Sequence, residues 1–172
     1  WLLPGRTTEQ SRPLLTHFPA ELIPAAVLVP LIEREDALTM LLTQRATQLK
    51  NHAGQISFPG GRIELSDDSP TAAALREAHE EIGLDAGFVT VAGYLPDHVI
   101  ITGFRVTPVV AFVLPGFELL LVSQEVQSTF EVPVTHVFDP GNHQLRRRRL
   151  GKSGTEVEVL DIPFGEHNIW GA

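Results

Sequence analysis

Cysteine is absent from the 172 residues, and several chemistries are excluded with it. Without a thiol there is no disulfide framework, no cysteine-ligated zinc, no cysteine nucleophile and no CxxC redox pair. No Asn-x-Ser/Thr glycosylation acceptor occurs either. A chain of this length buries enough of its surface to fold without such cross-links. We therefore expect one domain over residues 1–172, located in the cytoplasm.

The chain also lacks a long hydrophobic run and an excess of basic charge. Its longest apolar run, residues 22–32, has 11 residues and contains Pro24 and Pro30, whereas a membrane-spanning helix needs about 18 or more. The 13 Lys and Arg are outnumbered by 21 Asp and Glu, which leaves a net charge of −8. Nucleic acids and anionic membranes attract basic surfaces, so we predict neither as a partner.

Strand-like runs surround a single strong helix signal. Runs of apolar and β-branched residues predict strands at 22–32, 38–45, 88–95, 105–113 and 118–122. Residues 151–154 are typical of the turn of a hairpin between 144–150 and 156–162. Strands interrupted by one helix, with a late hairpin, predict an α/β (α+β) domain in layers.

The helix is expected between Ser69 and Gly83. Ser69 is a typical N-cap residue, Pro70 suits the first helical position, and Gly83 stands where a C-capping glycine belongs. The stretch TAAALREAHEEI between the caps consists almost entirely of strong helix formers.

Three glutamates share one face of this helix. Glu77, Glu80 and Glu81 are spaced i, i+3 and i+4, and no Lys or Arg follows at i+3 or i+4. Their repulsion costs about 0.2–0.5 kcal/mol per pair, and the helix dipole further disfavours anions in the last turn. A helix selected only for stability would avoid this arrangement, so we infer a functional cluster of hard oxygen ligands suited to Mg²⁺ or Mn²⁺. The alternative is an acidic helix face that is merely solvated.

Residues 60–84, GGRIELSDDSPTAAALREAHEEIGL, resemble the Nudix box, G-x5-E-x7-R-E-U-x-E-E-x-G-U, in which U is an apolar residue. The second half, REAHEEIGL, matches without a gap. In the first half, the stretch from Gly61 to Arg76 is one residue longer than the general box, and Asp67 or Asp68 replaces its glutamate. The resemblance implies a Nudix-type α/β/α sandwich with a mixed β-sheet.

The flanks of this segment are similar to the coenzyme A pyrophosphatase branch of the family, which shares the longer spacing with Asp. Upstream, LLTQRA at 41–46 and FPGG at 58–61 follow the branch pattern LLTxR[SA]-x3-R-x3-G-x3-FPGG, with Lys50 where arginine is usual. Three downstream segments are also similar, at 106–110, 124–126 and 169–172. In relatives the last of these continues as a helix beyond the position of Ala172.

The resemblance implies hydrolysis of the diphosphate bond of coenzyme A or its thioesters, giving 3′,5′-ADP and 4′-phosphopantetheine or its acyl derivative. Mg²⁺ or Mn²⁺ would bridge the anionic substrate and the acidic site. Two alternatives stay open. One is another nucleoside diphosphate derivative, such as NADH, a nucleotide sugar or a dNTP; the other is a Nudix-like binding module without catalysis. We expect a small-molecule partner and a monomer or homodimer.

The resemblance also implies roles for individual residues. The implied metal ligands are Glu77, Glu80, Glu81 and the carbonyl of Gly61. Arg76 is expected to orient the glutamates, and Glu77 and Glu125 are the two contenders for the general base. The residues expected to contact substrate are Arg45, Lys50 and Gly60.

Structural interpretations are available for several other polar residues. The arginines at 146–149 alternate faces on a strand, so at most two could meet one ligand, and we interpret them as a solvated hairpin. Arg45 and Glu125 could likewise be ordinary surface residues. The histidines without metal-ligand spacing are His79, His98, His136 and His143.

Overall fold

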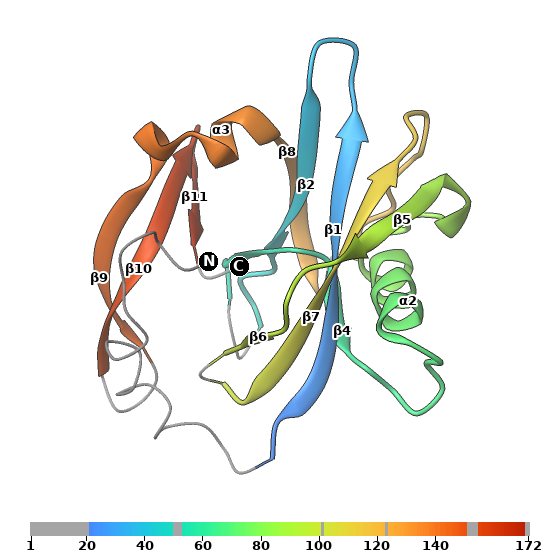
Figure 1. Ribbon diagram of the computed structural model, residues 1–172, viewed down its shortest axis with the longest axis horizontal. Coiled ribbons are helices and arrows are strands. Elements are labelled where there is room, and N and C mark those ends of the chain that lie inside the picture. The colour runs from blue at the N-terminus through green and yellow to red at the C-terminus, as the bar shows by residue number, and fades with distance from the viewer. Residues whose placement is uncertain (1–20, 50–52, 101, 123, 151–154, 171–172) are drawn as a thin grey trace.

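The structure is a computed structural model that describes residues 21–49, 53–100, 102–122, 124–150 and 155–170 (Figure 1). The strands of the central sheet are β1 (Ile23–Glu33), β2 (Leu38–Arg45), β3 (Ile56–Ser57), β4 (Gly60–Arg62), β5 (Val89–Tyr94), β6 (His98–Val99), β7 (Phe104–Val113) and β8 (Val126–Pro133). The second sheet consists of β9 (Gln144–Leu150), β10 (Thr155–Phe164) and β11 (His167–Trp170). The helices are α2 (Pro70–Ile82) and the short α3 (Val134–Phe138), with 3-10 turns at Ala86–Phe88 and Pro140–Asn142. None of these described helices is long and apolar enough to cross a membrane.

The central sheet is mixed. Its main order is β3-β2-β1-β7-β5, and β1 and β7 are parallel while the other pairs are antiparallel. One edge of β1 is divided between two partners: residues 25–27 pair with β4, and residues 31–33 pair with β2. This division places the glycine-rich β4 directly beside β1, where it underlies α2.

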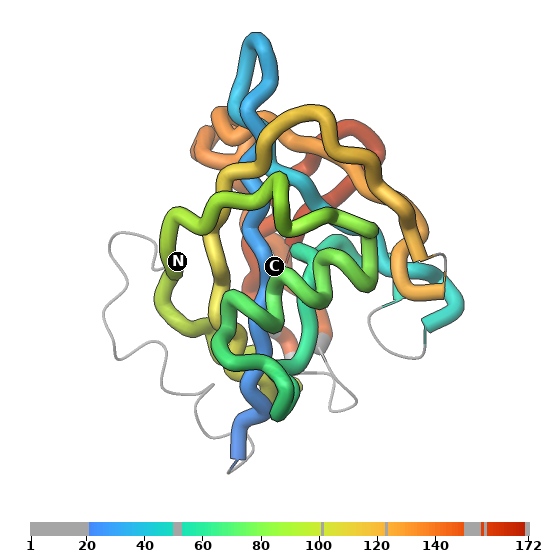
Figure 2. The backbone as a smooth tube through the Cα atoms, turned by 90° about the vertical axis from the view of Figure 1, so that its right-hand side faces the viewer, coloured from blue at the N-terminus to red at the C-terminus, as the bar shows by residue number. Residues whose placement is uncertain are grey.

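Helix α2 covers one face of the central sheet (Figures 1 and 2). Leu28, Ile32 and Val109 point from β1 and β7 into a core that the helix closes with Ala74 and Ile82. Small alanine side chains on the buried helix face let it approach the sheet closely. The close approach fixes the position of the adjoining glutamate-bearing face, whose Glu81 is itself buried.

The other face of the sheet packs against the second sheet and α3. Leu42, which follows the inward-facing Leu41 on β2, points to this side and contacts a cluster that includes Val132 and Ile169. The predicted α/β class and mixed sheet are therefore confirmed. In the described ranges, the layer opposite α2 is a three-stranded sheet with one short helix (Figure 1).

The predicted elements were mostly confirmed. The strands expected at 22–32, 38–45, 88–95 and 105–113 correspond to β1, β2, β5 and β7, and the expected hairpin is formed by β9 and β10. Its turn, residues 151–154, lies outside the described residues. The helix has the predicted caps: the Ser69 hydroxyl accepts a hydrogen bond from the Ala72 N–H, and Gly83 is left-handed with φ 70°.

The prediction of a strand at 118–122 was wrong, and the nearby strand β8 was not predicted. The N–H groups of Leu120 and Val122 donate to the carbonyls of Ile82 and Glu81, at 2.9 and 3.0 Å. These carbonyls belong to the last turn of α2, where no partner exists within the helix. The apolar run therefore closes the end of α2 instead of pairing in a sheet.

This contact gives a stability prediction for Gly83. A Cβ at this position would lie 2.9 Å from the Cβ and the N of Leu120, in a left-handed backbone conformation. Gly83→Ala should lower the free energy of unfolding by about 2–4 kcal/mol, because steric overlap adds to backbone strain. The matched control is Gly116→Ala, where φ is 97° and nothing lies within 4 Å, so that strain alone should cost about 1 kcal/mol. Urea denaturation measures both, and equal losses would contradict the close contact with Leu120.

Candidate active site

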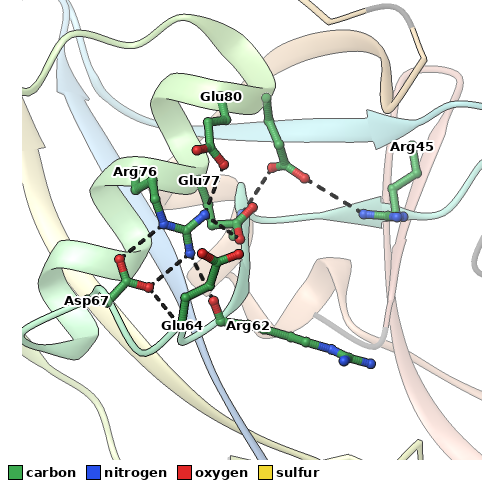
Figure 3. A network of polar contacts seen from close by, with 9 residues as sticks. Arg45, Arg62, Glu64, Asp67, Arg76, Glu77 and Glu80 are labelled. Atoms are coloured by element: carbon green, nitrogen blue, oxygen red, sulfur yellow. Dashed lines mark hydrogen bonds and ion pairs between the residues drawn. The ribbon is translucent and has the colours of Figure 1, made fainter.

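Arg76 connects the loop before α2 to two of the helix glutamates, Glu77 and Glu80 (Figure 3). Its Nε and Nη2 donate to the two carboxylate oxygens of Asp67, each at 3.0 Å, and Nη2 also donates to the Arg62 carbonyl at 3.0 Å. Its Nη1 donates to Glu77 at 3.0 Å and to Glu80 at 2.9 Å. A guanidinium has five N–H donors. Each of them has an acceptor here, so Arg76 has no donor left for a substrate.

Asp67 accepts two of the Arg76 hydrogen bonds and is itself held by the backbone. Its backbone N–H donates to the Glu64 carbonyl at 3.0 Å, and its side chain accepts from the Glu64 N–H at 2.8 Å. The Arg76 guanidinium, together with this backbone N–H, holds the pKa of Asp67 below its usual range. Asp68 is exposed. The sequence offered either aspartate as the replacement of the box glutamate, and neither was among the expected site residues; in the structure it is Asp67 that binds Arg76.

Glu81 is the most deeply buried of the three helix glutamates, with a side chain 5% exposed. One carboxylate oxygen accepts a hydrogen bond from the Gly60 N–H at 3.0 Å, and the other lies 3.8 Å from Nη1 of Arg45. Burial raises the pKa of Glu81 to about 7. The Gly60 hydrogen bond and the Arg45 charge oppose this rise, while the charges of Glu77 and Glu125 add to it.

The Glu77 carboxylate points from α2 toward strand β4. Burial raises its pKa, and the hydrogen bond and charge of Arg76 only partly offset the effect. A Cβ on Gly61 would collide with the Glu77 carboxylate, whereas a Cβ on Gly60 would collide with backbone atoms of Ala26 and Val27. The two glycines therefore permit two different close approaches: β4 against β1, and the Glu77 carboxylate against β4.

Glu125 reaches the same site from the turn before β8. Its N–H donates to the Val122 carbonyl and its carbonyl accepts from the Ala46 N–H, both at 2.9 Å. Its charge contributes to the raised pKa of both Glu77 and Glu81. The structure thus brings Glu125 to the helix glutamates, although their sequence separation is more than 40 residues.

Arg45 stands at the end of β2, opposite the buried glutamate. The pairing of β2 with β8 shifts register between Gln44 and Arg45. The Arg45 N–H donates to the Gln55 carbonyl at 2.9 Å, and its carbonyl accepts from the Gly54 N–H at 3.1 Å. The Nε atom of Arg45 is buried and has no hydrogen-bond partner. Lys50, the other expected phosphate contact, lies outside the described residues.

The donor set fits a hard divalent cation. Carboxylate and carbonyl oxygens are the ligands that Mg²⁺ and Mn²⁺ prefer, and Glu77 and Glu81 carry charge that burial disfavours. Among the described residues, no three His, Asp or Glu side chains already form a group that could hold a metal ion. Arg76 and Arg45 instead pair with the carboxylates.

The other candidates have structural partners. Arg146 and Arg148 pair with the fully buried Asp161 of β10, and Arg147 and Arg149 pair with acids on the opposite face of the same strand. The rings of His136 and His143 hydrogen-bond to backbone carbonyls at 2.8 and 2.7 Å. These contacts stabilise the second sheet and the segment around α3.

Comparison with known proteins identifies the family. A family model described as "NUDIX domain" matches residues 22–150. Two relatives, from Salmonella paratyphi B and Salmonella newport, are both named "Uncharacterized Nudix hydrolase NudL". Each is 43% identical over 162 residues, which cover 93% of this chain and 82% of the relative. The fold and site therefore define a hydrolase of diphosphate substrates, and the chain belongs to the Nudix family.

Solved structures agree on the fold. The Nudix hydrolase RenU from M. smegmatis has a TM-score of 0.58 and 27% identity, over 69% of this chain and 75% of that one. A C. elegans Ap4A hydrolase has a TM-score of 0.55 and 21% identity, over 63% and 79%. The NUDIX domain of Shewanella oneidensis NrtR, solved with ADP ribose, has a TM-score of 0.51 and 19% identity, over 77% and 86%.

The burial of Glu81 predicts an unusual pH dependence of stability. Its folded-state pKa, about 7, lies above the ordinary value of 4.5. Between these pH values the folded state binds more protons than the unfolded state, so metal-free stability falls as the pH rises. In EDTA, Glu81→Gln should become more stable than the parent by roughly 1–3 kcal/mol between pH 5 and pH 8. Glu80→Gln, on the same face but 57% exposed, is the control, and parallel parent and Glu81→Gln curves would contradict the assignment.

The two glycines of β4 should respond differently to alanine. Gly61→Ala should displace the Glu77 carboxylate and reduce diphosphate hydrolysis by about tenfold or more, because small misplacements of reacting groups are costly. Gly60→Ala meets backbone atoms instead, so its main effect should be a loss of stability. Steady-state kinetics and thermal melts of both variants separate the two outcomes. Full activity of folded Gly61→Ala would show that the position of Glu77 is not needed.

Proposed function

We propose that this chain hydrolyses the diphosphate bond of coenzyme A or its thioesters, releasing 3′,5′-ADP and 4′-phosphopantetheine or its acyl derivative. The observation that carries the proposal is the partner of Arg76. Arg76 binds both carboxylate oxygens of Asp67, each at 3.0 Å, and Asp67 is one of the two aspartates that replace the box glutamate in the longer spacing. The similarity to the coenzyme A pyrophosphatase branch includes this spacing. It also includes the LLTQRA segment, which ends β2 at Arg45, beside Glu81.

Each site residue has a proposed role. Glu77, Glu80, Glu81 and the Gly61 carbonyl would hold the Mg²⁺ or Mn²⁺ ions. When bound, the ions neutralise the diphosphate and lower the pKa of the attacking water. Arg76 is a positioning residue that fixes Glu77 and Glu80 through the hydrogen bonds described above. The Gly60 N–H holds Glu81 in the same way.

We assign the general base to Glu125. Glu77, the other contender, has one carboxylate oxygen fixed by Arg76 and is needed as a ligand. Glu125 is exposed on a turn, and its charge acts on the half-buried Glu77 and the buried Glu81. Its carboxylate accepts the proton of the attacking water, and the guanidinium of Arg45 binds a substrate phosphate. Lys50 is the second proposed phosphate contact.

Other diphosphates are the alternative substrates. The similar structures include an Ap4A hydrolase and a domain solved with ADP ribose, and their low identity to this chain gives the fold alone. NADH, a nucleotide sugar and a dNTP belong to the same chemical class. A binding module without catalysis is disfavoured because the box glutamates Glu77, Glu80 and Glu81 are all present.

The decisive experiment is a substrate panel with product identification. The protein is incubated with Mg²⁺ or Mn²⁺ and coenzyme A, acetyl-coenzyme A, NADH, ADP-ribose, Ap4A and a dNTP, and products are identified by mass spectrometry. We expect 3′,5′-ADP from the two coenzyme A substrates, no turnover in EDTA, recovery on adding metal, and a loss of orders of magnitude in Glu81→Gln. Faster hydrolysis of another substrate would show that this substrate, and not coenzyme A, is preferred. No hydrolysis of any substrate would favour the binding module.

A further inference from the structure

The two arginines of the site differ in how well their donors are satisfied. All five N–H groups of Arg76 have acceptors within 3.0 Å. Arg45 has a 3.8 Å ion pair with Glu81, longer than a hydrogen bond, and its buried Nε has no partner. Buried donors are almost always satisfied in folded proteins. The geometry of Arg45 therefore indicates that an acceptor other than Glu81 completes its contacts.

The main chain of Arg45 is fixed, although its side chain is incompletely bonded. Its N–H and carbonyl bond to Gln55 and Gly54, and the next residue, Ala46, donates to the carbonyl of Glu125. The side chain is 29% exposed, so it has access to solvent and to a ligand. A guanidinium anchored in this way can change partners by rotation of its side chain alone.

Glu81 does not depend on Arg45 for its position. The Gly60 N–H holds one carboxylate oxygen at 3.0 Å, and the remaining oxygen faces Arg45. A divalent cation ligated by Glu81 would place a second positive charge beside the guanidinium. The cation and Arg45 therefore compete for one carboxylate, because like charges at this separation repel strongly in a partly buried site.

We infer that Arg45 couples cation binding to substrate binding: it is the counter-ion of Glu81 until a cation binds there, and is then available to a substrate phosphate. This inference rests on the proposed function and adds an order of events to it. Coupling between two ligands is reciprocal. The cation therefore increases the affinity for the phosphate, and the phosphate increases the affinity for the cation.

The coupling predicts that removing Arg45 affects the two ligands in opposite directions. Without substrate, Arg45→Gln removes the competitor of the cation, so Mn²⁺ should bind more tightly. Phosphate binding should weaken, because the acceptor loses its guanidinium. An arginine that served only as a phosphate contact would leave the Mn²⁺ affinity unchanged, and one that positioned Glu81 for the metal would make Mn²⁺ binding weaker when removed.

The first test is Mn²⁺ binding to the substrate-free protein, followed by the electron paramagnetic resonance of free Mn²⁺. Arg45→Gln should lower the dissociation constant at least about fivefold, the lower end of typical coupling factors. Arg45→Lys keeps the charge and should stay near the parent. The matched control is Arg62→Gln, which removes the same charge from a side chain that lies over the Phe104 ring at 5.4 Å and points away from the carboxylates (Figure 3). Its Mn²⁺ affinity should change less than about twofold.

A double-mutant cycle then locates the effect. In the Glu81→Gln background, Arg45→Gln should no longer tighten Mn²⁺ binding, because the shared carboxylate charge is gone. Thermal melts in EDTA verify that each variant is folded. An unchanged or weaker Mn²⁺ affinity in folded Arg45→Gln, or an equal gain in Arg62→Gln, overturns the inference.

The second test measures binding of the anion, in the parent and in an Arg45 variant. Calorimetric titration of the parent with 3′,5′-ADP should give a tighter dissociation constant with Mn²⁺ than in EDTA, and Arg45→Gln should reduce this gain because the side chain that exchanges partners is gone. Equal parent affinities in both conditions overturn the coupling. The Mn²⁺ experiments contain no substrate, so their result is independent of the substrate panel. A panel without turnover rejects the proposed function, whereas a failed Mn²⁺ test rejects only the coupling.

Discussion

The arrangement of the site depends on the guanidinium of Arg76. Two of its bonds go to Asp67, one to the Arg62 carbonyl, and two to the helix glutamates Glu77 and Glu80. It therefore joins the end of β4, the following loop and the exposed face of α2 in one planar set of contacts. Paired charge-assisted bonds of this kind fix direction as well as distance. If Arg76 were removed, the loop and the two glutamates would lose the hydrogen-bond partner that they share, and Glu77 would no longer be held against Gly61.

The rest of the fold stabilises helix α2 although it carries carboxylates in its last turn, where the helix dipole disfavours them. Glu81 occupies the last turn of α2 and is buried to 4% exposure. The last-turn carbonyls are satisfied by Leu120 and Val122 and by the Gly83 cap, so the end of the helix is stable despite its acidic side chains. The alanine face of the helix holds it against the sheet. Stability supplied by packing and capping thus offsets electrostatic repulsion that a bound cation would relieve.

The sequence predicted what depends on near neighbours. Ser69 and Gly83 define the helix locally, and the spacing of the glutamates depends only on helical periodicity. It did not predict what depends on tertiary contacts. The run at 118–122 has strand composition, but its N–H groups bind the end of α2, which composition cannot reveal. Likewise, the choice between Asp67 and Asp68 is decided by which carboxylate the folded loop presents to Arg76, and the pairing of Arg45 with Glu81 requires the assembled sheet.

The difference between the two arginines explains how one acidic site can be both rigid and responsive. Arg76 is saturated, so exchanging its partners would cost several charge-assisted hydrogen bonds at once. Arg45 has a long ion pair and an unpaired Nε. Binding a new acceptor would therefore break no short hydrogen bond to Glu81 and could add hydrogen bonds. In a rigid centre, a bound cation would still attract an anion, and only a side chain that exchanges partners adds the further coupling proposed for Arg45. A flexible centre alone would not hold the glutamates in place. Because the Gly60 N–H bonds one oxygen of Glu81 at 3.0 Å while the other oxygen faces Arg45, an exchange of partners by Arg45 would leave the Glu81 carboxylate its backbone hydrogen bond.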